Sequence, residues 1–175
     1  MTALSPKRIV VVGIGYVGAG AALGTTVNYL FHKTHYDRTE DALAIRASFC
    51  TSPAIPHRGS NFFSEFLGAF VLLFVIFYIS DGAVQTTEGE MPVGLGSVGA
   101  IPAAFLVWVI GISLGGTTGY AINPARDLGP RIAYQLLPIR HKTDAAWHYS
   151  WIPVVAPLAG GAAAYLAKEA LLMTV

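Results

Sequence analysis

The chain has 175 residues, of which 54% are hydrophobic and only 12% are charged, whereas a soluble globular domain usually carries about 25% charged residues. The net charge of +1 and the lack of a basic stripe argue against a nucleic-acid-binding protein. The single cysteine, Cys50, excludes an intrachain disulfide and is interpreted as an ordinary loop thiol.

The apolar residues gather into four stretches that are each near the length of a membrane-spanning helix. A helix needs about 20 residues to cross a hydrocarbon core of roughly 30 Å. All four lack Lys and Arg, and Glu65 is their only acidic residue. We therefore treat residues 1–175 as a single membrane domain, with predicted spans at Ile9–Phe31, Phe62–Ile79, Leu95–Leu114 and Trp151–Ala167.

The start of the first stretch also matches a dinucleotide-binding fingerprint. Gly13, Gly15 and Gly18 form G-x-G-x-x-G after a strand-like run, and Asp37 follows at about the 20-residue spacing of a ribose-binding acid. The fingerprint needs alternating strands and helices around it, whereas the rest of the chain holds three more uncharged apolar stretches. We therefore expect a membrane span here rather than a cofactor site.

A signal peptide is a second alternative for this segment. Lys7 and Arg8 precede the apolar run, and the A-G-A triplet at 19–21 resembles a cleavage site. The apolar stretch continues beyond that triplet to Phe31, which favours an uncleaved span.

The polar segment 32–61 separates the first two predicted spans. Its acids, bases and prolines predict a solvated loop. His32 and His35 are of a metal-ligating type, but a zinc site takes three or four protein ligands and no third ligand stands out nearby. We therefore expect no metal site.

A shorter apolar segment, 115–137, comes before the last span. Irregular backbone at membrane depth is tolerated only where it lines a cavity or is buried in protein. Gly115, Gly116 and Gly119 permit such backbone with bare carbonyl groups. The segment therefore has the re-entrant pattern of channels and transporters.

Within this segment, a short helix is expected to begin at Pro124. Asn123 is a favourable N-cap, and proline suits the first helical position. The N-terminus of such a helix carries partial positive charge and free N–H groups, and Arg126 adds a full charge beside it. In an apolar channel this arrangement would repel cations and protons while offering hydrogen bonds to neutral solutes.

The residues around this helix start resemble the second NPA box of the major intrinsic proteins. Asn123-Pro124-Ala125-Arg126 matches the box, and the run G-Y-A-I-N-P-A-R-D-L-G-P-R at 119–131 is similar to bacterial glycerol facilitators. Asp127 resembles the glycerol-conducting branch, because strict water channels usually have a small residue there. From about Asp37 onward, the chain resembles the C-terminal half of an aquaglyceroporin.

The resemblance also implies roles for residues outside the box. Glu65 lies in a segment that looks like the family's fourth helix, where it would brace the pore-loop backbone. The alternative is an acid near a helix N-terminus that reaches the interface. Gly111 stands where water-selective members place His, which would widen the constriction for a polyol. The implied pore and selectivity positions are Asn123, Pro124, Ala125, Arg126, Tyr120 and Gly111, and the supporting positions are Asp127, Arg131, Pro153, Val154 and Glu65.

The same resemblance implies a way of passing glycerol. Arg126 would donate hydrogen bonds to the hydroxyl groups, and backbone carbonyls at 120–122 would accept from them. The Tyr120 ring would cover the carbon edge of the solute, and Asn123 would donate at the midplane. No covalent chemistry is implied, so we expect neither an enzyme nor a cofactor.

We expect an all-α, multi-pass membrane protein with about four transmembrane helices and one re-entrant half-helix, resembling part of the aquaporin fold. It would be a passive channel for glycerol, small polyols and water, surrounded by lipid. A partner, either another membrane subunit or a copy of the same chain, would supply the first NPA half. The alternatives are a non-conducting structural subunit of a larger membrane complex and a truncated version of a longer channel.

Overall fold

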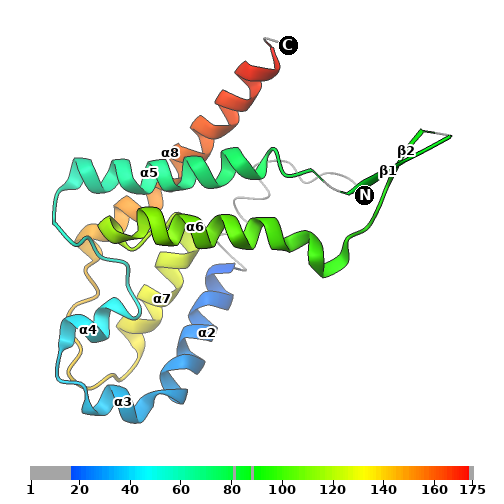
Figure 1. Ribbon diagram of the computed structural model, residues 1–175. Coiled ribbons are helices and arrows are strands. Elements are labelled where there is room, and N and C mark those ends of the chain that lie inside the picture. The colour runs from blue at the N-terminus through cyan, green and yellow to red at the C-terminus, as the bar shows by residue number, and fades with distance from the viewer. Residues whose placement is uncertain (1–16, 81, 88, 174–175) are drawn as a thin grey trace.

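The computed structural model describes residues 17–80, 82–87 and 89–173, and helices dominate them (Figure 1). Two short strands form a hairpin between the helices of the middle of the chain. In chain order the elements are α2 (Gly18–Phe31), α3 (Lys33–Arg38), α4 (Ala42–Ala47), α5 (Arg58–Ile76), β1 (Ala83–Thr86), β2 (Gly89–Pro92), a 3-10 helix (Gly96–Ala100), α6 (Ile101–Thr118), α7 (Pro124–Leu136) and α8 (Trp147–Leu172).

Three helical segments among the described residues are long and apolar enough to cross a membrane: Arg58–Ile76, Gly96–Thr118 and Trp147–Leu172. They correspond to the predicted spans 62–79, 95–114 and 151–167, with most ends displaced by about one helical turn. The start of α5 shows why. The His57 Nδ1 accepts a hydrogen bond from the Ser60 N–H at 3.1 Å, so a polar cap begins the helix before its apolar part.

The predicted first span, 9–31, is seen only in its second half. α2 supplies helix at 18–31, whereas residues 9–16 lie outside the described part of the chain. Lys7, Arg8 and the first glycines of the dinucleotide-binding fingerprint also lie outside it. The fold therefore tests neither the cofactor-binding interpretation nor the signal-peptide interpretation.

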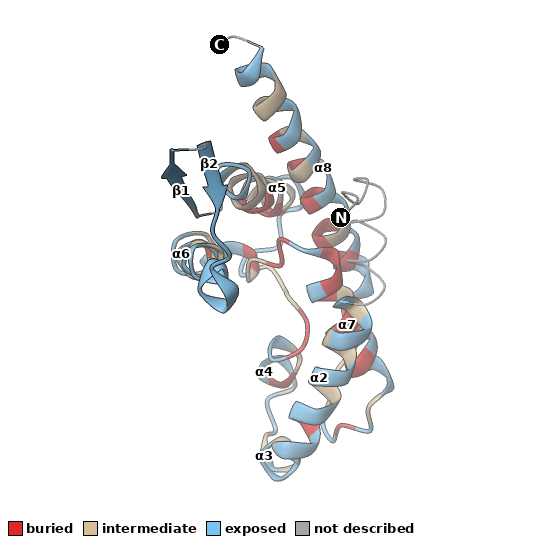
Figure 2. Cartoon of the chain, turned by 90° about the vertical axis from the view of Figure 1, so that its right-hand side faces the viewer, coloured by how far each residue is buried: buried red, intermediate tan, exposed pale blue. Residues whose placement is uncertain are grey.

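Glycines allow two pairs of helices, α5 with α8 and α2 with α7, to pack with their backbones in close approach. A Cβ added at Gly160 of α8 would meet backbone atoms of α5, with the Phe66 carbonyl oxygen nearest and the Phe70 nitrogen 3.1 Å away. A Cβ added at Gly129 of α7 would lie 2.9 Å from the Ala21 Cβ of α2. Close approach through small residues is how membrane helices associate. Figure 2 shows the buried residues gathered on α5, α7 and α8.

The prediction of a solvated loop at 32–61 is wrong for much of that segment. It contains α3 and α4, and Ile45, Phe49 and Cys50 are buried in a cluster with Tyr29 and Tyr134. Cys50 is 1% exposed, and burial raises the pKa of its thiol to about 11, so it is not an ordinary loop thiol. Because these buried residues stand in a segment rich in charged and polar side chains, the sequence pattern alone does not indicate their burial.

The connection 80–94 carries the β1–β2 hairpin. The strands pair antiparallel, from Ala83 opposite Pro92 to Thr86 opposite Gly89. Four-residue strands give too few alternating positions for the period-two pattern to be recognised from sequence.

Candidate functional site

The loop between α6 and α7 has an unusual backbone. α6 ends at Thr118, and Gly119 follows with a φ of 79°. Tyr120 and Ile122 also have positive φ, at 40° and 45°. Such conformations cost about 1–3 kcal/mol for residues other than glycine and persist only where the surroundings fix them.

Glu65 of α5 is the group that fixes this backbone. Its side chain is almost completely buried, at 1% exposed. One carboxylate oxygen accepts the Ala121 N–H at 3.0 Å, and the other accepts the Ile122 N–H at 2.7 Å. Hydrogen bonds to an ionised carboxylate are stronger than those between neutral groups. The carboxylate therefore satisfies two loop donors that no helix or strand could satisfy.

α7 begins at Pro124, the residue at which the sequence predicts a helix start. The Asn123 Oδ1 accepts the Ala125 N–H at 2.9 Å and caps the helix. Pro124 and Ala125 are buried behind Asn123, whereas Asn123 itself is exposed. This leaves the Asn123 Nδ2 as a donor with no hydrogen-bond partner in the described residues.

Arg126 lies in the first turn of α7 and is exposed like Asn123. Its Nη1 donates to the Tyr120 carbonyl at 2.9 Å and to the Gly119 carbonyl at 3.2 Å. The guanidinium carbon lies 4.6 Å from the centroid of the Tyr120 ring. A guanidinium has five N–H donors, so those on Nε and Nη2 are not used by these two bonds.

Two glycines of α6 accommodate the Tyr120 ring. A Cβ at Gly115 would lie 2.6 Å from the Tyr120 Cδ1, and a Cβ at Gly111 would lie 3.0 Å from the Tyr120 Cζ. Gly111 was expected to widen a constriction, and the structure places it against this ring. Gly115 was not among the predicted site residues, although its spacing of four from Gly111 puts both on one helix face.

Asp127 and Arg131 form a buried ion pair on the other side of α7. Both side chains are 0% exposed, and two hydrogen bonds join them, at 2.8 Å from Nε and 2.6 Å from Nη2. Asp127 also accepts from the Thr51 hydroxyl, and Arg131 donates to the carbonyls of Thr51, Ala145 and Ala146. The pair thus fastens α7 to the segments that precede α5 and α8.

A cavity of about 360 Å³ leads to Arg126 and is lined by residues 47–52, Gly119 and others. Pro153 and Val154 of α8 do not line it; Pro153 is buried and Val154 is half-buried. The described residues contain no group of three or more His, Cys, Asp or Glu side chains that could hold a metal ion.

Comparison with known proteins places this arrangement in a family. Residues 3–168 match the model described as "MIP: Major intrinsic protein". The "Glycerol uptake facilitator protein" of Bacillus subtilis is 48% identical over 156 residues, which are 89% of this chain and 53% of the relative. The protein of the same name from Streptococcus pneumoniae is 49% identical, over 85% of this chain and 59% of the relative.

Other relatives include a transporter of a different solute. The "D/L-lactic acid transporter" of Lactiplantibacillus plantarum is 39% identical, over 83% of this chain and 58% of that protein. Among solved structures, the aquaglyceroporin from Plasmodium falciparum superposes with a TM-score of 0.62 at 26% identity, covering 83% of this chain and 57% of that one. The chain spans about half the length of the curated relatives it matches. It is a multi-pass integral membrane protein, and it belongs to the major intrinsic protein family.

Proposed function

We propose that this chain forms the Arg126-bearing wall of a passive channel for glycerol, small polyols and water. The observation that carries the proposal is the position of Arg126. Two backbone carbonyls hold its Nη1, while its remaining donors lie on the exposed side that also presents Asn123. The similarity to glycerol uptake facilitators supports the choice of solute.

The chemistry of glycerol suits this wall. Glycerol has one edge of hydroxyl groups and one edge of C–H groups, so its passage needs hydrogen-bonding groups on one side and apolar surface on the other. The free donors of Arg126 serve the hydroxyl oxygens. The carbonyls of Gly119 and Tyr120 each keep a second lone pair for a hydroxyl proton. Asn123 offers its amide further along the path.

Charge selection follows from the same groups. The N-terminus of α7 carries about half an elementary positive charge, and Arg126 adds a full one beside it. Both repel cations and protons at the same point of the path. A neutral polyol is not subject to this barrier, so the same groups can pass it while excluding cations and protons.

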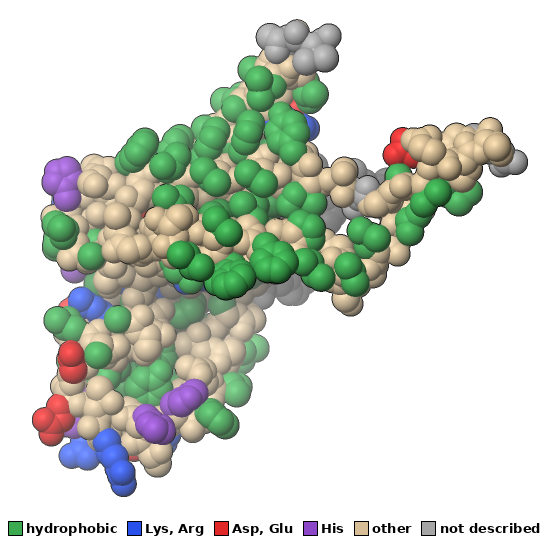
Figure 3. Space-filling view, viewed as in Figure 1, with side chains coloured by type: hydrophobic (Ala, Val, Ile, Leu, Met, Phe, Trp, Pro, Cys, Tyr) green, Lys and Arg blue, Asp and Glu red, His purple; other side chains and the backbone are tan. Residues whose placement is uncertain are grey.

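In a membrane, the exposed side that carries Arg126 and Asn123 must be shielded from lipid. Figure 3 shows apolar side chains spread over α5 and α6, as lipid contact requires, and charged side chains gathered over α3 and α4. An arginine facing lipid at the centre of a bilayer costs at least roughly 2.5–3.5 kcal/mol. We therefore infer that a second wall of comparable size, carried by another polypeptide segment or a second copy of this chain, faces Arg126 across the path.

Stopped-flow light scattering of proteoliposomes tests the proposal. The purified chain is reconstituted alone and together with a polypeptide carrying the first NPA half of a related facilitator. Glycerol entry faster than in empty vesicles, and reduced or altered by Arg126→Ala but not by Arg38→Ala, supports it. Entry equal to that of empty vesicles in both reconstitutions, from protein shown to be helical by circular dichroism, would overturn it.

A further inference from the structure

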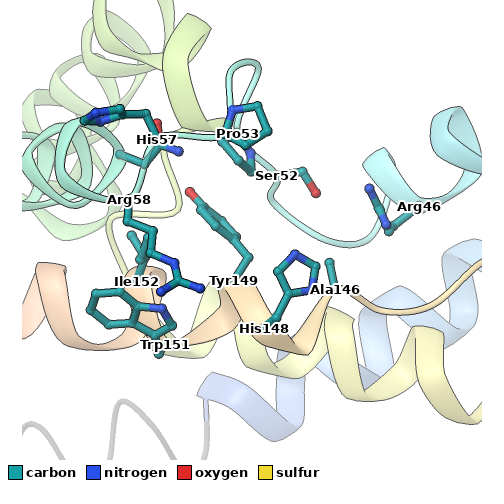
Figure 4. A pocket seen from close by; sticks show the side chains of 12 residues that line it. Arg46, Ser52, Pro53, His57, Arg58, Ala146, His148, Tyr149, Trp151 and Ile152 are labelled. Carbon is teal, nitrogen blue, oxygen red and sulfur yellow. The ribbon is translucent and has the colours of Figure 1, made fainter.

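A second cavity lies apart from Arg126, between the start of α5 and the start of α8 (Figure 4). Its volume is about 340 Å³. The segment before α5 lines one side with Ser52 and His57, and α8 lines the other with His148 and Tyr149. None of the pore-loop residues lines this cavity, and Ser52 is the residue that it shares with the cavity at Arg126.

Two hydroxyl groups in this cavity lack partners. Among the described residues, the Ser52 Oγ and the Tyr149 hydroxyl are the buried side-chain polar atoms left without a hydrogen bond. Tyr149 is only 6% exposed, and Figure 4 shows its ring projecting from α8 into the middle of the lining side chains. A buried hydroxyl without a partner costs about 1–3 kcal/mol. Two such groups facing one cavity indicate a ligand with hydrogen-bonding atoms.

The charge around the cavity favours an anion. Arg58 is exposed and makes no ion pair within the described residues. Arg46, across the cavity, forms an ion pair with Asp144, in which the Arg46 Nη1 and the Asp144 Oδ2 are 3.5 Å apart. Asp144 also accepts a hydrogen bond from the Ala146 N–H at 2.7 Å, which lowers the pKa of its carboxyl. Asp144 is not among the residues that line the cavity. The lining therefore has an excess of positive charge.

The backbone adds further donors. α8 begins at Trp147 after Ala146, which provides no side-chain cap. The Tyr149 N–H donates to the Ala146 carbonyl at 3.0 Å, and the N–H groups of Trp147 and His148 before it carry the positive end of the helix dipole. The His57 Nδ1 accepts from Ser60, which leaves the proton of a neutral ring on Nε2. The cavity thus meets the positive ends of two helices, α5 and α8, and its unused polar groups are mostly donors.

We propose that this cavity binds a phosphate group, carried either by a lipid headgroup or by a small soluble phosphate. Its tetrahedral oxygens are acceptors that match the hydroxyls of Ser52 and Tyr149 and the guanidinium of Arg58. Trp147 and Trp151 are exposed at the start of α8, and tryptophan is enriched at the membrane–water interface. The cavity therefore lies at the depth of lipid headgroups, where basic pockets between membrane helices recognise them.

Titration of the purified full chain in detergent tests this site. One arm adds inorganic phosphate at constant ionic strength, and a second adds short-chain phosphatidylglycerol with the matching diacylglycerol as a phosphate-free control. Tryptophan fluorescence reports binding, since Trp151 lines the cavity. Arg58→Gln should weaken binding about tenfold and Tyr149→Phe about threefold, as expected for a lost charged and a lost neutral hydrogen bond.

The control variant is Arg140→Gln, which removes an exposed arginine outside the cavity and should leave affinity within about twofold. Saturable binding in both arms supports a site for the phosphate group itself. Binding of lipid alone identifies the headgroup as the source, and binding of inorganic phosphate alone identifies a soluble ligand. Failure to saturate in both arms, equal binding of diacylglycerol, or an equal loss in Arg140→Gln and Arg58→Gln would overturn the proposal.

Discussion

Asp127 and Arg131 lie one helical turn apart on α7 and form a doubly hydrogen-bonded ion pair that is completely shielded from solvent. Breaking a buried pair leaves an uncompensated charge, which typically costs about 3–5 kcal/mol. Arg131→Leu should therefore lower the thermal unfolding midpoint of the detergent-solubilised chain sharply, and Asp127→Leu in the same chain should restore part of the loss.

The exposed pair Lys33–Asp37 is the matched control for that prediction. Its nitrogen and oxygen are 2.7 Å apart, but both side chains face solvent in part. Exposed pairs contribute about 0–1 kcal/mol, so Lys33→Ala should leave the midpoint nearly unchanged. An equal loss in Lys33→Ala and Arg131→Leu would contradict the role assigned to the buried pair.

Glu65→Gln separates charge from shape at the loop between α6 and α7. An amide has one acceptor oxygen, so one of the Ala121 and Ile122 N–H groups would face an NH₂ group instead. We expect a loss of about 1–3 kcal/mol in stability and reduced glycerol entry in proteoliposomes. Glu169→Gln, near the end of α8, should behave like the wild type. Unchanged permeability in Glu65→Gln would show that the loop keeps its shape without the carboxylate.

Gly115→Ala tests whether the Tyr120 ring must pack directly against α6. The added methyl group would lie 2.6 Å from the Tyr120 Cδ1, so the ring must move away from α6. Since Arg126 lies over that ring, glycerol permeability should change. Gly116→Ala, next along the helix, meets nothing within 4 Å and should leave permeability unchanged. The prediction fails if the two variants have the same permeability.

Asn123 has two functions that can be separated. Asn123→Ala removes the helix cap and should cost about 0.5–2 kcal/mol of stability. Asn123→Asp keeps an oxygen for the Ala125 N–H, so stability should survive, but it exchanges the free amide donor for a negative charge. Glycerol entry should therefore fall in both variants, and unfolding should change only in the first. Normal glycerol entry in Asn123→Asp would exclude the amide from the path.

Cys50 provides a pH-dependent prediction. Burial raises the pKa of its thiol from 9.0 to about 11, so the folded chain holds that proton more tightly than the unfolded chain. This contribution to stability is complete below pH 9.0 and is lost as the pH rises towards about 11. Below pH 9, N-ethylmaleimide should modify the folded chain about a hundredfold more slowly than the denatured chain, because the thiolate is the reactive form. Similar rates in both states would contradict the burial.

Local chemistry made part of the site predictable. The cap at Asn123 and the proline after it determine the start of α7 within a few residues of sequence, so their pattern alone predicts it. The long apolar stretches likewise predict the three spanning segments, since length and hydropathy are local properties. The family resemblance adds Arg126 and Glu65, whose predicted positions depend on that resemblance and not on local pattern.

The rest depends on contacts between distant parts of the chain. The partners of Arg131 include Thr51, and no local pattern connects positions so far apart. The same holds for Ile45 and Phe49, whose burial against Tyr134 turns an apparently polar loop into packed structure. The spacing of Gly115 from Gly111 puts both on one helix face, but only the fold shows that the Tyr120 ring occupies the space beside them.

The acceptors of Arg131 also set an order of events during synthesis. They come from Thr51, before α5, and from Ala145 and Ala146, just before α8. The guanidinium therefore cannot be fully satisfied until the ribosome has released residue 146 and the last helix has begun to insert. α7 carries Arg126 as well as Arg131, so under the proposed function the Arg126-bearing wall would be completed only once α8 follows α7 into the bilayer.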